Sequence, residues 1–247
     1  ASVGTRARLR PTRSAGEGSV RDAAGLAKAQ GLQFDTVPIE AAVAGVTESL
    51  APIMEGTSPD STEENIQARV RGIILMAISN KFGGMVVTTG NKSEMSVGYA
   101  TLYGDMNGGY NPIKDLYKME VYRLARWRNA NVPKGALGPA GVVIPDSIIT
   151  KVPSAELRPD QTDQDTLPPY EELDDILACL VEHEMPLADI VARGHAPDVV
   201  KRIEGMLYLA EYKRRQAPPG VKISSRNFGR DRRYPIVNKF REPVGKT

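Results

Sequence analysis

The stretch from Thr88 to Asp105, TTGNKSEMSVGYATLYGD, combines the residue types that are best suited to bind phosphate groups. It begins with hydroxyls and a glycine turn directly after a short apolar run. A turn of this kind can bring backbone N–H groups close to an anion, and one carboxylate can hold a Mg²⁺ ion that bridges phosphates. Glu94 is the candidate for that carboxylate. The alternative interpretation is an ordinary glycine turn with a Ser or Glu helix cap.

A second group of polar residues lies in STEENIQARVR, where Asn65 and Arg69 stand four residues apart. On a helix this spacing places both side chains on one face, opposite much of the apolar stripe. Arginine can bind phosphate oxygens with two parallel hydrogen bonds, and the asparagine can hold a second polar group. The alternative is a solvated helix face, where most arginines lie.

Two lysines occupy the inward faces of predicted helices. Lys118 shares a face with Val121 and Ala125 near a helix start, where an inward ammonium would add to the positive helix end. The alternative is a buried stem with the ammonium in water. Lys213 extends the stripe of an upstream helix into its last turn, where it can also complement the helix dipole.

The elements that must position these residues follow from the sequence pattern. Residues 20–30 predict a helix that ends at Gly31, and residues 34–39 predict a strand that stops near Pro38. Ser61 and Glu64 predict a capping box. The helix that follows has an apolar stripe of Ile66, Val70, Ile73, Ile74 and Ala77, and residues 85–88 predict a short buried strand.

Alternation of helices and strands predicts an α/β fold with a mostly parallel sheet covered on both faces. Ligands of such sheets bind at the carboxyl ends of the strands, which is where Thr89 would lie. Residues 1–150 are predicted to form this region. Residues 151–247 are predicted to form an extension with two amphipathic helices, at 173–181 and 199–210, and a last part of about 30 residues without regular structure.

Composition excludes several kinds of protein. No apolar stretch approaches the ~20 residues of a membrane span, and the basic amino-terminal residues lack the apolar run of a secretory signal. The single cysteine, Cys179, excludes an internal disulfide, and the two histidines make a histidine-based metal site improbable. We expect a reducing, cytoplasmic setting, with Cys179 as a packed, inert thiol.

The charge distribution is uneven although the net charge is only +2. Residues 156–184 are rich in acids, and residues 213–246 are rich in Arg and Lys. This basic tail predicts an anionic partner. One alternative is nucleic acid, with aromatic rings for stacking; the competing interpretation is an arm that packs on the acidic region of a neighbouring subunit. The tail residues in question are Lys222, Arg226, Phe228, Arg230, Arg232, Arg233, Tyr234, Lys239, Phe240 and Arg241.

Several long motifs, in their order, resemble one known family. They are STEENIQARVRG, TTGNKSEMSVGYATLYGDMNGGYNPIKDLYK and KVPSAELRPDQTDQDTLPPYEELD. Together they resemble the synthetase domain of NAD synthetases, from about Ser19 to Glu242. AEYKRRQAPPGVKI and RRYPIVNKFRE resemble the glutamine-dependent branch. The resemblance implies a Rossmann-like fold of the adenine nucleotide alpha-hydrolase type, incomplete at the amino terminus.

The resemblance also implies an activity. Members of this family amidate deamido-NAD (nicotinic acid adenine dinucleotide) to NAD with ATP and Mg²⁺, through an adenylated intermediate. By motif, Thr89, Lys118, Arg69 and Ser154 match ATP contacts, whereas Asn65, Glu94, Lys213 and Asp105 match deamido-NAD contacts. Glu94 is also the candidate metal ligand, and no residue is assigned a directly catalytic role. Many family sites lie at a dimer interface, so we expect a homo-oligomer in which Lys213 serves a neighbouring subunit.

Two family features are absent from the sequence. The chain has no copy of the ATP-pyrophosphatase loop SGGxDS; SAGEGS at residues 14–19 follows RARLRPTR, which lacks the apolar character of a buried strand. The glutaminase domain that releases ammonia from glutamine is also absent, and Cys179 cannot replace its nucleophile. Three alternatives therefore stay open: a catalytically silent fragment or assembly subunit, a related GMP or asparagine synthetase, and a nucleic-acid-binding protein.

Overall fold

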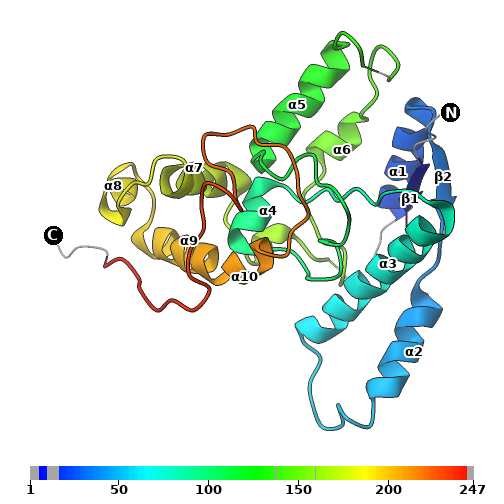
Figure 1. Cartoon of the computed structure of the whole chain (residues 1–247), viewed down its shortest axis with the longest axis horizontal. Coiled ribbons are helices and arrows are strands. Elements are labelled where there is room, and N and C mark those ends of the chain that lie inside the picture. Colours follow the sequence, from blue (N-terminus) through cyan, green and yellow to red (C-terminus); the bar gives the residue numbers. More distant parts are fainter. Residues whose placement is uncertain (1–5, 10–16, 137, 159, 244–247) are drawn as a thin grey trace. The chain divides into compact units, whose positions relative to one another are not determined.

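The computed structural model describes residues 6–9, 17–136, 138–158 and 160–243 (Figure 1). The chain divides into two compact units. The first combines the residues up to Arg71 with Tyr122–Asp165, and the second combines Gly72–Val121 with the residues from Thr166 onward. Each unit thus contains residues from both regions predicted on either side of residue 150, and that predicted division stays a prediction.

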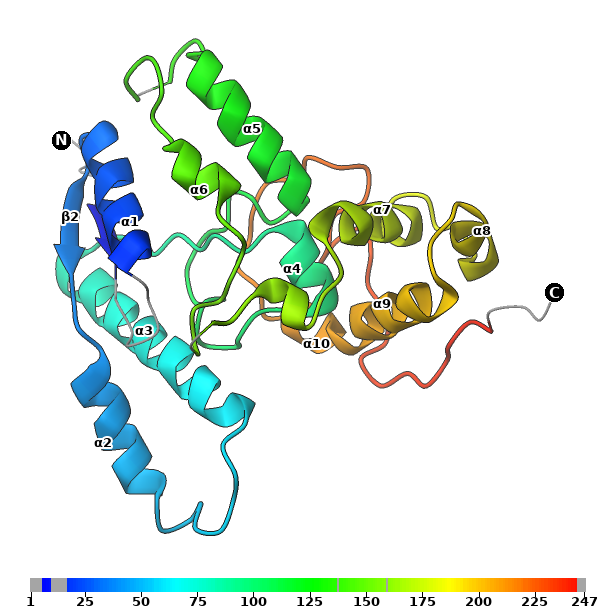
Figure 2. The ribbon, with the colours of Figure 1, turned by 180° about the vertical axis from the view of Figure 1, so that it is seen from behind.

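A short parallel sheet lies in the first unit. Strands β1 (Arg6–Leu9) and β2 (Gln33–Thr36) pair in register from Arg6 with Gln33 to Leu9 with Thr36. Helix α1 (Glu17–Ala29) connects them and packs against both strands (Figure 2). Parallel strands need such a crossover. The helix predicted at 20–30 is confirmed, and the strand predicted at 34–39 forms but ends at Thr36, before Pro38.

The end of α1 and the composition of β1 have different physical explanations. Gly31 follows α1 with φ +65, a left-handed conformation that glycine adopts at little cost. The segment RARLRPTR was expected to lack the apolar character of a buried strand, yet its first four residues form β1. Backbone pairing with β2, rather than a hydrophobic pattern, defines this strand.

Helices α2 (Glu40–Leu50) and α3 (Ser61–Phe82) follow the sheet. The capping box predicted from Ser61 and Glu64 is wrong by one residue. The Asp60 carboxylate accepts from Thr62 N at 2.7 Å, and the Glu63 carboxylate accepts from Asp60 N at 2.8 Å. Asp60 is one residue closer to the loop, so its side chain can reach back over the first turn.

The apolar stripe predicted for α3 is buried only in part. Ile66 and Val70 are buried, whereas Ile73 and Ala77 are exposed. The first unit also contains most of α5 (Lys118–Ala130) and the short helix α6 (Asp146–Thr150). The loop between them is held by the Asn129 side chain, whose oxygen accepts from Val143 N at 3.0 Å and Ile144 N at 2.9 Å.

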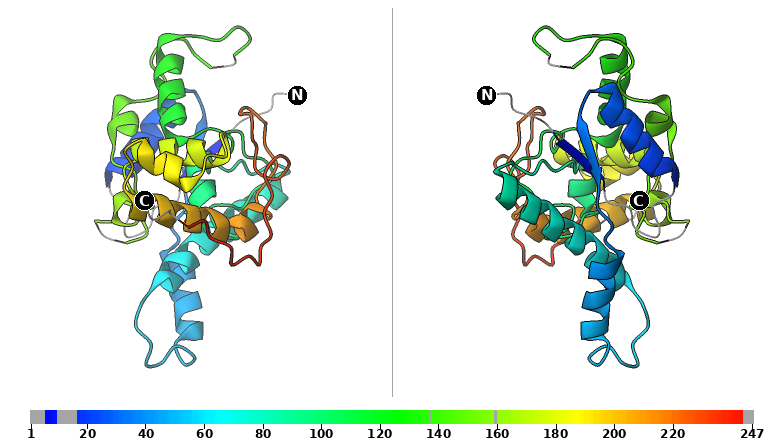
Figure 3. Two further views of the ribbon diagram at one scale, coloured as in Figure 1. Left: turned by 90° about the vertical axis from the view of Figure 1, so that its left-hand side faces the viewer. Right: turned by 90° about the vertical axis from the view of Figure 1, so that its right-hand side faces the viewer.

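The second unit contains the main hydrophobic core. Its helices are α4 (Lys92–Val97), α7 (Tyr170–Val181), α8 (Leu187–Ala192), α9 (Pro197–Leu209) and α10 (Glu211–Arg214). Helix α9 packs against α4, α7 and α8, and Figure 3 shows the yellow and orange helices side by side. Both predicted amphipathic helices are confirmed as α7 and α9, and the core residues they supply include Leu173, Ile176, Leu177, Val200, Ile203 and Leu207.

The strand predicted at residues 85–88 does not form. Val87 makes only an isolated parallel bridge with Tyr110, and Met85 and Val87 are exposed. The apolar run looked like a buried strand, but its pairing with Gly109 and Tyr110 stops after two backbone hydrogen bonds, from Thr88 N to Tyr110 O and from Gly109 N to Val86 O, so no ladder forms. Thr88 at the end of the run is buried.

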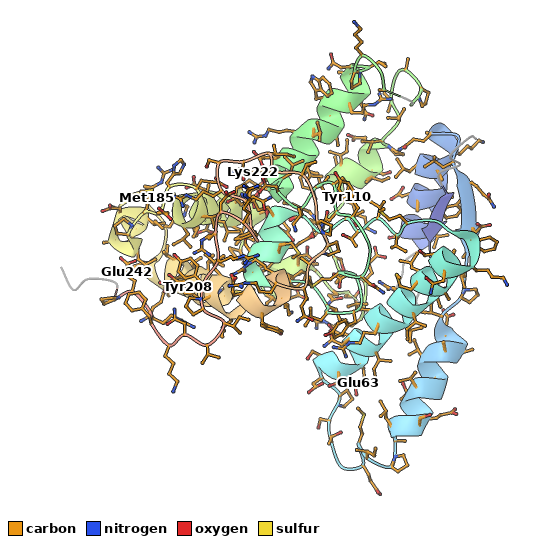
Figure 4. The ribbon with its side chains drawn as sticks, viewed as in Figure 1. Glu63, Tyr110, Met185, Tyr208, Lys222 and Glu242 are labelled. Atoms are coloured by element: carbon orange, nitrogen blue, oxygen red, sulfur yellow. The ribbon has the colours of Figure 1, made fainter. Side chains whose placement is uncertain are left out.

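After α10 the described chain has no helix or strand as far as residue 243, as predicted. This segment is held by its own chain. Arg226 pairs with Glu184 at 2.8 Å, and Lys222, labelled in Figure 4, pairs with Asp231 at 2.7 Å. These two tail residues therefore find acidic partners within the same unit, and the predicted packing of the tail on a neighbouring subunit stays a prediction.

Candidate functional site

The Thr88 to Asp105 segment is built around α4. Asn91 is the N-cap: its side-chain oxygen accepts from Glu94 N at 3.0 Å, and the Glu94 carboxylate accepts from Asn91 N at 3.1 Å. The motif therefore does contain a helix cap, with Asn91 as the N-cap and Glu94 as its reciprocal partner, whereas a serine or glutamate cap was expected. The box fixes the Glu94 carboxylate at the positive end of a helix, whereas Thr89, just before it, is exposed.

Glu94 and Lys118 meet although 24 residues separate them. Lys118 is the first residue of α5, as predicted, and its Nζ lies 3.1 Å from Glu94 Oε1 and 5.1 Å from the centre of the Tyr170 ring. Both charged side chains are about four-fifths buried, at 18% and 19% exposure. Lys118 therefore does not simply extend into water; its ammonium is held beside the carboxylate that caps α4.

The carboxyl end of α4 is held by two cations from α10. Lys213 Nζ donates to Gly98 O at 2.8 Å and to Ala100 O at 2.7 Å. The buried Arg214 guanidinium donates to Met95 O at 3.2 Å and Ser96 O at 2.8 Å. Lys213 was expected to complement its own helix or to serve a neighbouring subunit; here it satisfies carbonyls at the end of α4, where a cation is favoured.

Asp105 lies in the electrostatic field of the same group. Its carboxylate accepts from Thr101 N at 2.6 Å. Its side chain is exposed to solvent, yet the protein crowded around it disfavours the charged form and raises the pKa of its carboxyl above the ordinary value. The hydrogen bond from Thr101 N opposes this shift, the charge of Glu94 adds to it and the charge of Lys213 opposes it. Four of the predicted residues, Glu94, Asp105, Lys118 and Lys213, are thus brought together around α4.

Three predicted residues belong to the first unit. Asn65 and Arg69 lie on α3, Asn65 half-buried and Arg69 exposed. Ser154 is half-buried in the loop after α6, where its hydroxyl accepts from Glu156 N at 3.0 Å. Their predicted convergence with Thr89 and Lys118 on one pair of nucleotides stays a prediction.

Sequence reasoning missed Lys92, the first residue of α4. Its side chain is fully buried, and Nζ pairs with Asp115 at 2.9 Å and with Glu182. It also donates to Ser224 Oγ at 2.6 Å and Arg226 O at 2.7 Å. The only feature of the sequence that pointed to Lys92 was its position within the motif. Its acidic partners could not be predicted because they lie far away along the chain.

Asp115 contacts both the Lys92 ammonium and the backbone of the carboxyl-terminal segment. Burial alone would raise the pKa of Asp115, but hydrogen bonds from the backbone N–H groups of Ile223 and Ser224, together with Lys92, hold that pKa below its usual value. A buried ion pair is tolerated when its remaining lone pairs are satisfied in this way. Lys92 is therefore the anchor that fastens residues 223–226 to α4.

The other missed residues and the cysteine have structural explanations. Cys179 is buried in the core, as predicted, and burial raises the pKa of its thiol, which disfavours the nucleophilic thiolate. Arg214 was not predicted because its carbonyl partners on α4, Met95 O and Ser96 O, lie more than 100 residues upstream. Among the described residues, no helix has the length and hydropathy required to cross a membrane.

Gly98 closes α4 and provides a test of the packing around it. It has φ +73, and a Cβ at this position would lie 2.9 Å from Ala210 Cβ. We expect Gly98→Ala to lower the free energy of unfolding by about 2 kcal/mol, through the left-handed backbone and the steric contact.

Urea denaturation measures this effect. Gly205→Ala is the matched control, because Gly205 lies within α9 in the same unit and a Cβ there meets no atom within 4 Å. This control should be neutral or stabilising by up to about 1 kcal/mol. Equal losses in both variants would contradict the predicted contact with Ala210.

Comparison with known proteins identifies the family. The family model for NAD synthase matches residues 5–217. A glutamine-dependent NAD(+) synthetase of Rhodobacter capsulatus is 57% identical over 232 residues, which are 94% of this chain and 42% of that protein. A glutamine-dependent NAD(+) synthetase of Thermotoga maritima is 49% identical over 236 residues, 96% of this chain and 40% of that protein.

Solved structures agree. The glutamine-dependent NAD+ synthetase of Acinetobacter baumannii, in complex with ADP, matches with a TM-score of 0.56 and 42% identity, covering 94% of this chain and 40% of that one. That of Cytophaga hutchinsonii has a TM-score of 0.77 at 22% identity, covering 95% and 39%. The predicted Rossmann-like α/β fold class is confirmed. This chain spans about 40% of the length of its curated relatives, and it belongs to the NAD synthase family.

Proposed function

We propose that this chain is the synthetase portion of a ligase that uses ATP to amidate deamido-NAD to NAD. Family membership over residues 5–217 supports the reaction. The observation that carries it to a site is the ion pair of Glu94 and Lys118 at the end of the Thr88 to Asn91 turn. A fixed cation beside a glycine turn is an arrangement that suits a nucleotide phosphate.

The proposed chemistry overcomes the poor reactivity of a carboxylate. The carboxylate oxygen of deamido-NAD attacks the α-phosphorus of ATP, and pyrophosphate leaves. Ammonia then attacks the acyl carbon of the adenylate, a proton is lost, and AMP leaves with the electron pair of the broken C–O bond. Positioning and charge neutralisation lower the barrier of both steps.

The residues around α4 have separate proposed roles. Thr89 and Lys118 contact ATP: the exposed Thr89 presents a hydroxyl, and Lys118 presents a charge held in place by Glu94. Asp105 and Lys213 shape the deamido-NAD side. Because two Lys213 protons already go to main-chain carbonyls, we assign it mainly to holding α4. Asn65, Arg69 and Ser154 complete the nucleotide contacts in this proposal.

The proposed Mg²⁺ ion would be held by few protein ligands. The described residues contain no group of three or more His, Cys, Asp or Glu side chains that could hold a metal. Mg²⁺ often uses only one or two carboxylates together with substrate phosphates, so Glu94 fits a single contact to an ion that arrives with ATP. Such an ion would neutralise phosphate charge. Glutaminase-derived ammonia, a homo-oligomer and a cytoplasmic location stay predictions.

The nucleic-acid alternative has less support. Several of the required cations and rings are engaged within the chain. The buried Arg232 lies 4.2 Å from the Tyr234 ring centre, and the Arg241 guanidinium lies 5.3 Å from the ring centre of Tyr208. Phe228 is buried beneath Arg214. Stacking of bases on these rings would require the described contacts to break.

The test is NAD formation by the polypeptide encoded in the complete reading frame that contains this chain. With deamido-NAD, ATP and ammonia, we expect one AMP and one pyrophosphate for each NAD. Lys118→Met should lower kcat/KM about 100-fold, through loss of a preorganised charge. Lys134→Met, which removes an exposed lysine of the first unit, is the control and should leave the rate unchanged.

The alternatives predict different results in the same assay. A silent assembly subunit would form no NAD even with ammonia supplied. A related amidotransferase would consume xanthosine monophosphate or aspartate in place of deamido-NAD. A nucleic-acid-binding protein would show steeply salt-dependent binding to RNA or DNA. Any of these outcomes, without NAD formation, would reject the proposed function.

A further inference from the structure

The first N–H groups of α5 are bound by side chains from several parts of the second unit. Tyr117 precedes the first helical residue, Lys118, and its side chain provides no local acceptor for the first-turn N–H groups. The Glu120 carboxylate accepts from Tyr117 N at 2.9 Å, which satisfies the N–H before the helix. The N–H groups of Lys118 and Met119 have no partner within the helix by geometry alone.

Two side chains from other helices satisfy them. Ser93 Oγ, on α4, accepts from Lys118 N at 2.8 Å. The Asp174 carboxylate, on α7, accepts from Met119 N at 2.9 Å and also from the Ser93 hydroxyl. Ser93 is fully buried and Asp174 is 8% exposed. The cap of α5 is thus tertiary: it exists only when α4, α5 and α7 are packed together.

This cap and the Lys118 ion pair come from adjacent residues. Ser93 holds the backbone N–H of Lys118, and the next residue, Glu94, holds its ammonium at 3.1 Å. The two ends of the lysine are therefore fixed by the same short helix. A change at Ser93 releases the backbone end while the carboxylate partner stays in place.

We propose that Ser93 and Asp174 are positioning residues for Lys118, which they hold toward Glu94 by capping α5 from outside. The catalytic consequence rests on the function proposed above. Because Asp174 holds both Met119 N and the Ser93 hydroxyl, it orients the serine as well as the helix. Neither residue needs to touch a substrate to influence the reaction.

Ser93→Ala is the principal test, with Ser96→Ala as the matched control. Both hydroxyls are fully buried on α4, but the Ser96 hydroxyl bonds only to Lys92 O within α4 at 2.7 Å. In the polypeptide of the complete reading frame, Ser93→Ala should lower kcat/KM for ATP about tenfold, and Ser96→Ala should leave it unchanged. In a Lys118→Ala background, Ser93→Ala should have no further effect.

A second measurement separates this inference from the proposed function. Acetic anhydride labelling of Lys118, followed by mass spectrometry, should be several-fold faster in Ser93→Ala than in Ser96→Ala, with or without substrates. Equal labelling in the two variants, or an undiminished Ser93→Ala effect without Lys118, overturns the positioning role. Faster labelling in a protein that forms no NAD upholds the positioning of Lys118 and rejects the proposed reaction.

Discussion

Replacing Lys92 with methionine is expected to lower the free energy of unfolding by about 3 to 5 kcal/mol, the usual effect of removing one partner of a buried ion pair. Methionine fills a similar volume but leaves the carboxylates of Asp115 and Glu182 without their cation. It also removes the donor to Ser224 Oγ and Arg226 O. The loss should therefore release residues 223–226 from the core.

Chemical denaturation and hydrogen exchange measure these two consequences. Lys222→Met is the matched control: Lys222 pairs with Asp231 in the same unit, but its side chain is 49% exposed. An exposed pair contributes about 0 to 1 kcal/mol. Exchange of the Ile223 and Ser224 amide protons should accelerate in Lys92→Met only. A Lys92→Met loss no larger than that of the control would show that the buried charge does not anchor the segment.

The second large effect concerns the ionisation of Asp174. Burial raises the pKa of its carboxyl to about 6 from 3.8, with Glu120 and Glu171 adding to the shift, although Met119 N and Ser93 oppose it. The folded state therefore binds the proton more tightly than the unfolded state. The stability contributed by this group is complete below the unfolded pKa and is lost as the pH rises through about 6.

Asp174→Asn removes this titration and keeps one acceptor for Met119 N. Relative to the parent protein, the variant should gain roughly 2.5 kcal/mol of unfolding free energy between pH 4 and pH 7.5, from the difference between the two pKa values and the partial ionisation of the unfolded carboxyl at pH 4. Urea denaturation across that range gives the difference curve. The same variant should lose activity, because neutral asparagine holds α5 less firmly than the carboxylate does.

Asp231→Asn serves as the control for pH dependence. Hydrogen bonds from Lys222 and Asn227 lower the pKa of Asp231, so its titration lies below this pH range and the difference curve should stay flat. A flat curve for Asp174→Asn as well would mean that the Asp174 carboxyl titrates as an ordinary aspartate, and that its burial is compensated by the two hydrogen bonds it accepts.

The sequence alone determined the elements whose signals are local. The period of apolar residues predicted α7 and α9, and a glycine after the last helical residue predicted the end of α1. The family followed from long motifs that need no structure to be recognised. Local hydrogen bonding was predicted less well. Ser61 was the predicted cap of α3, but the observed cap is Asp60, because several adjacent side chains can compete for the same N–H groups.

Only the tertiary structure decided which distant side chains meet. Lys92 finds Asp115 and Glu182, and the first turn of α5 finds Ser93 and Asp174, across separations of up to 90 residues. No periodicity encodes such pairs, since each depends on how several helices pack at once. Residues 85–88 failed as a strand for the same reason: strand formation depends on neighbouring backbone, and hydrophobicity alone does not supply it.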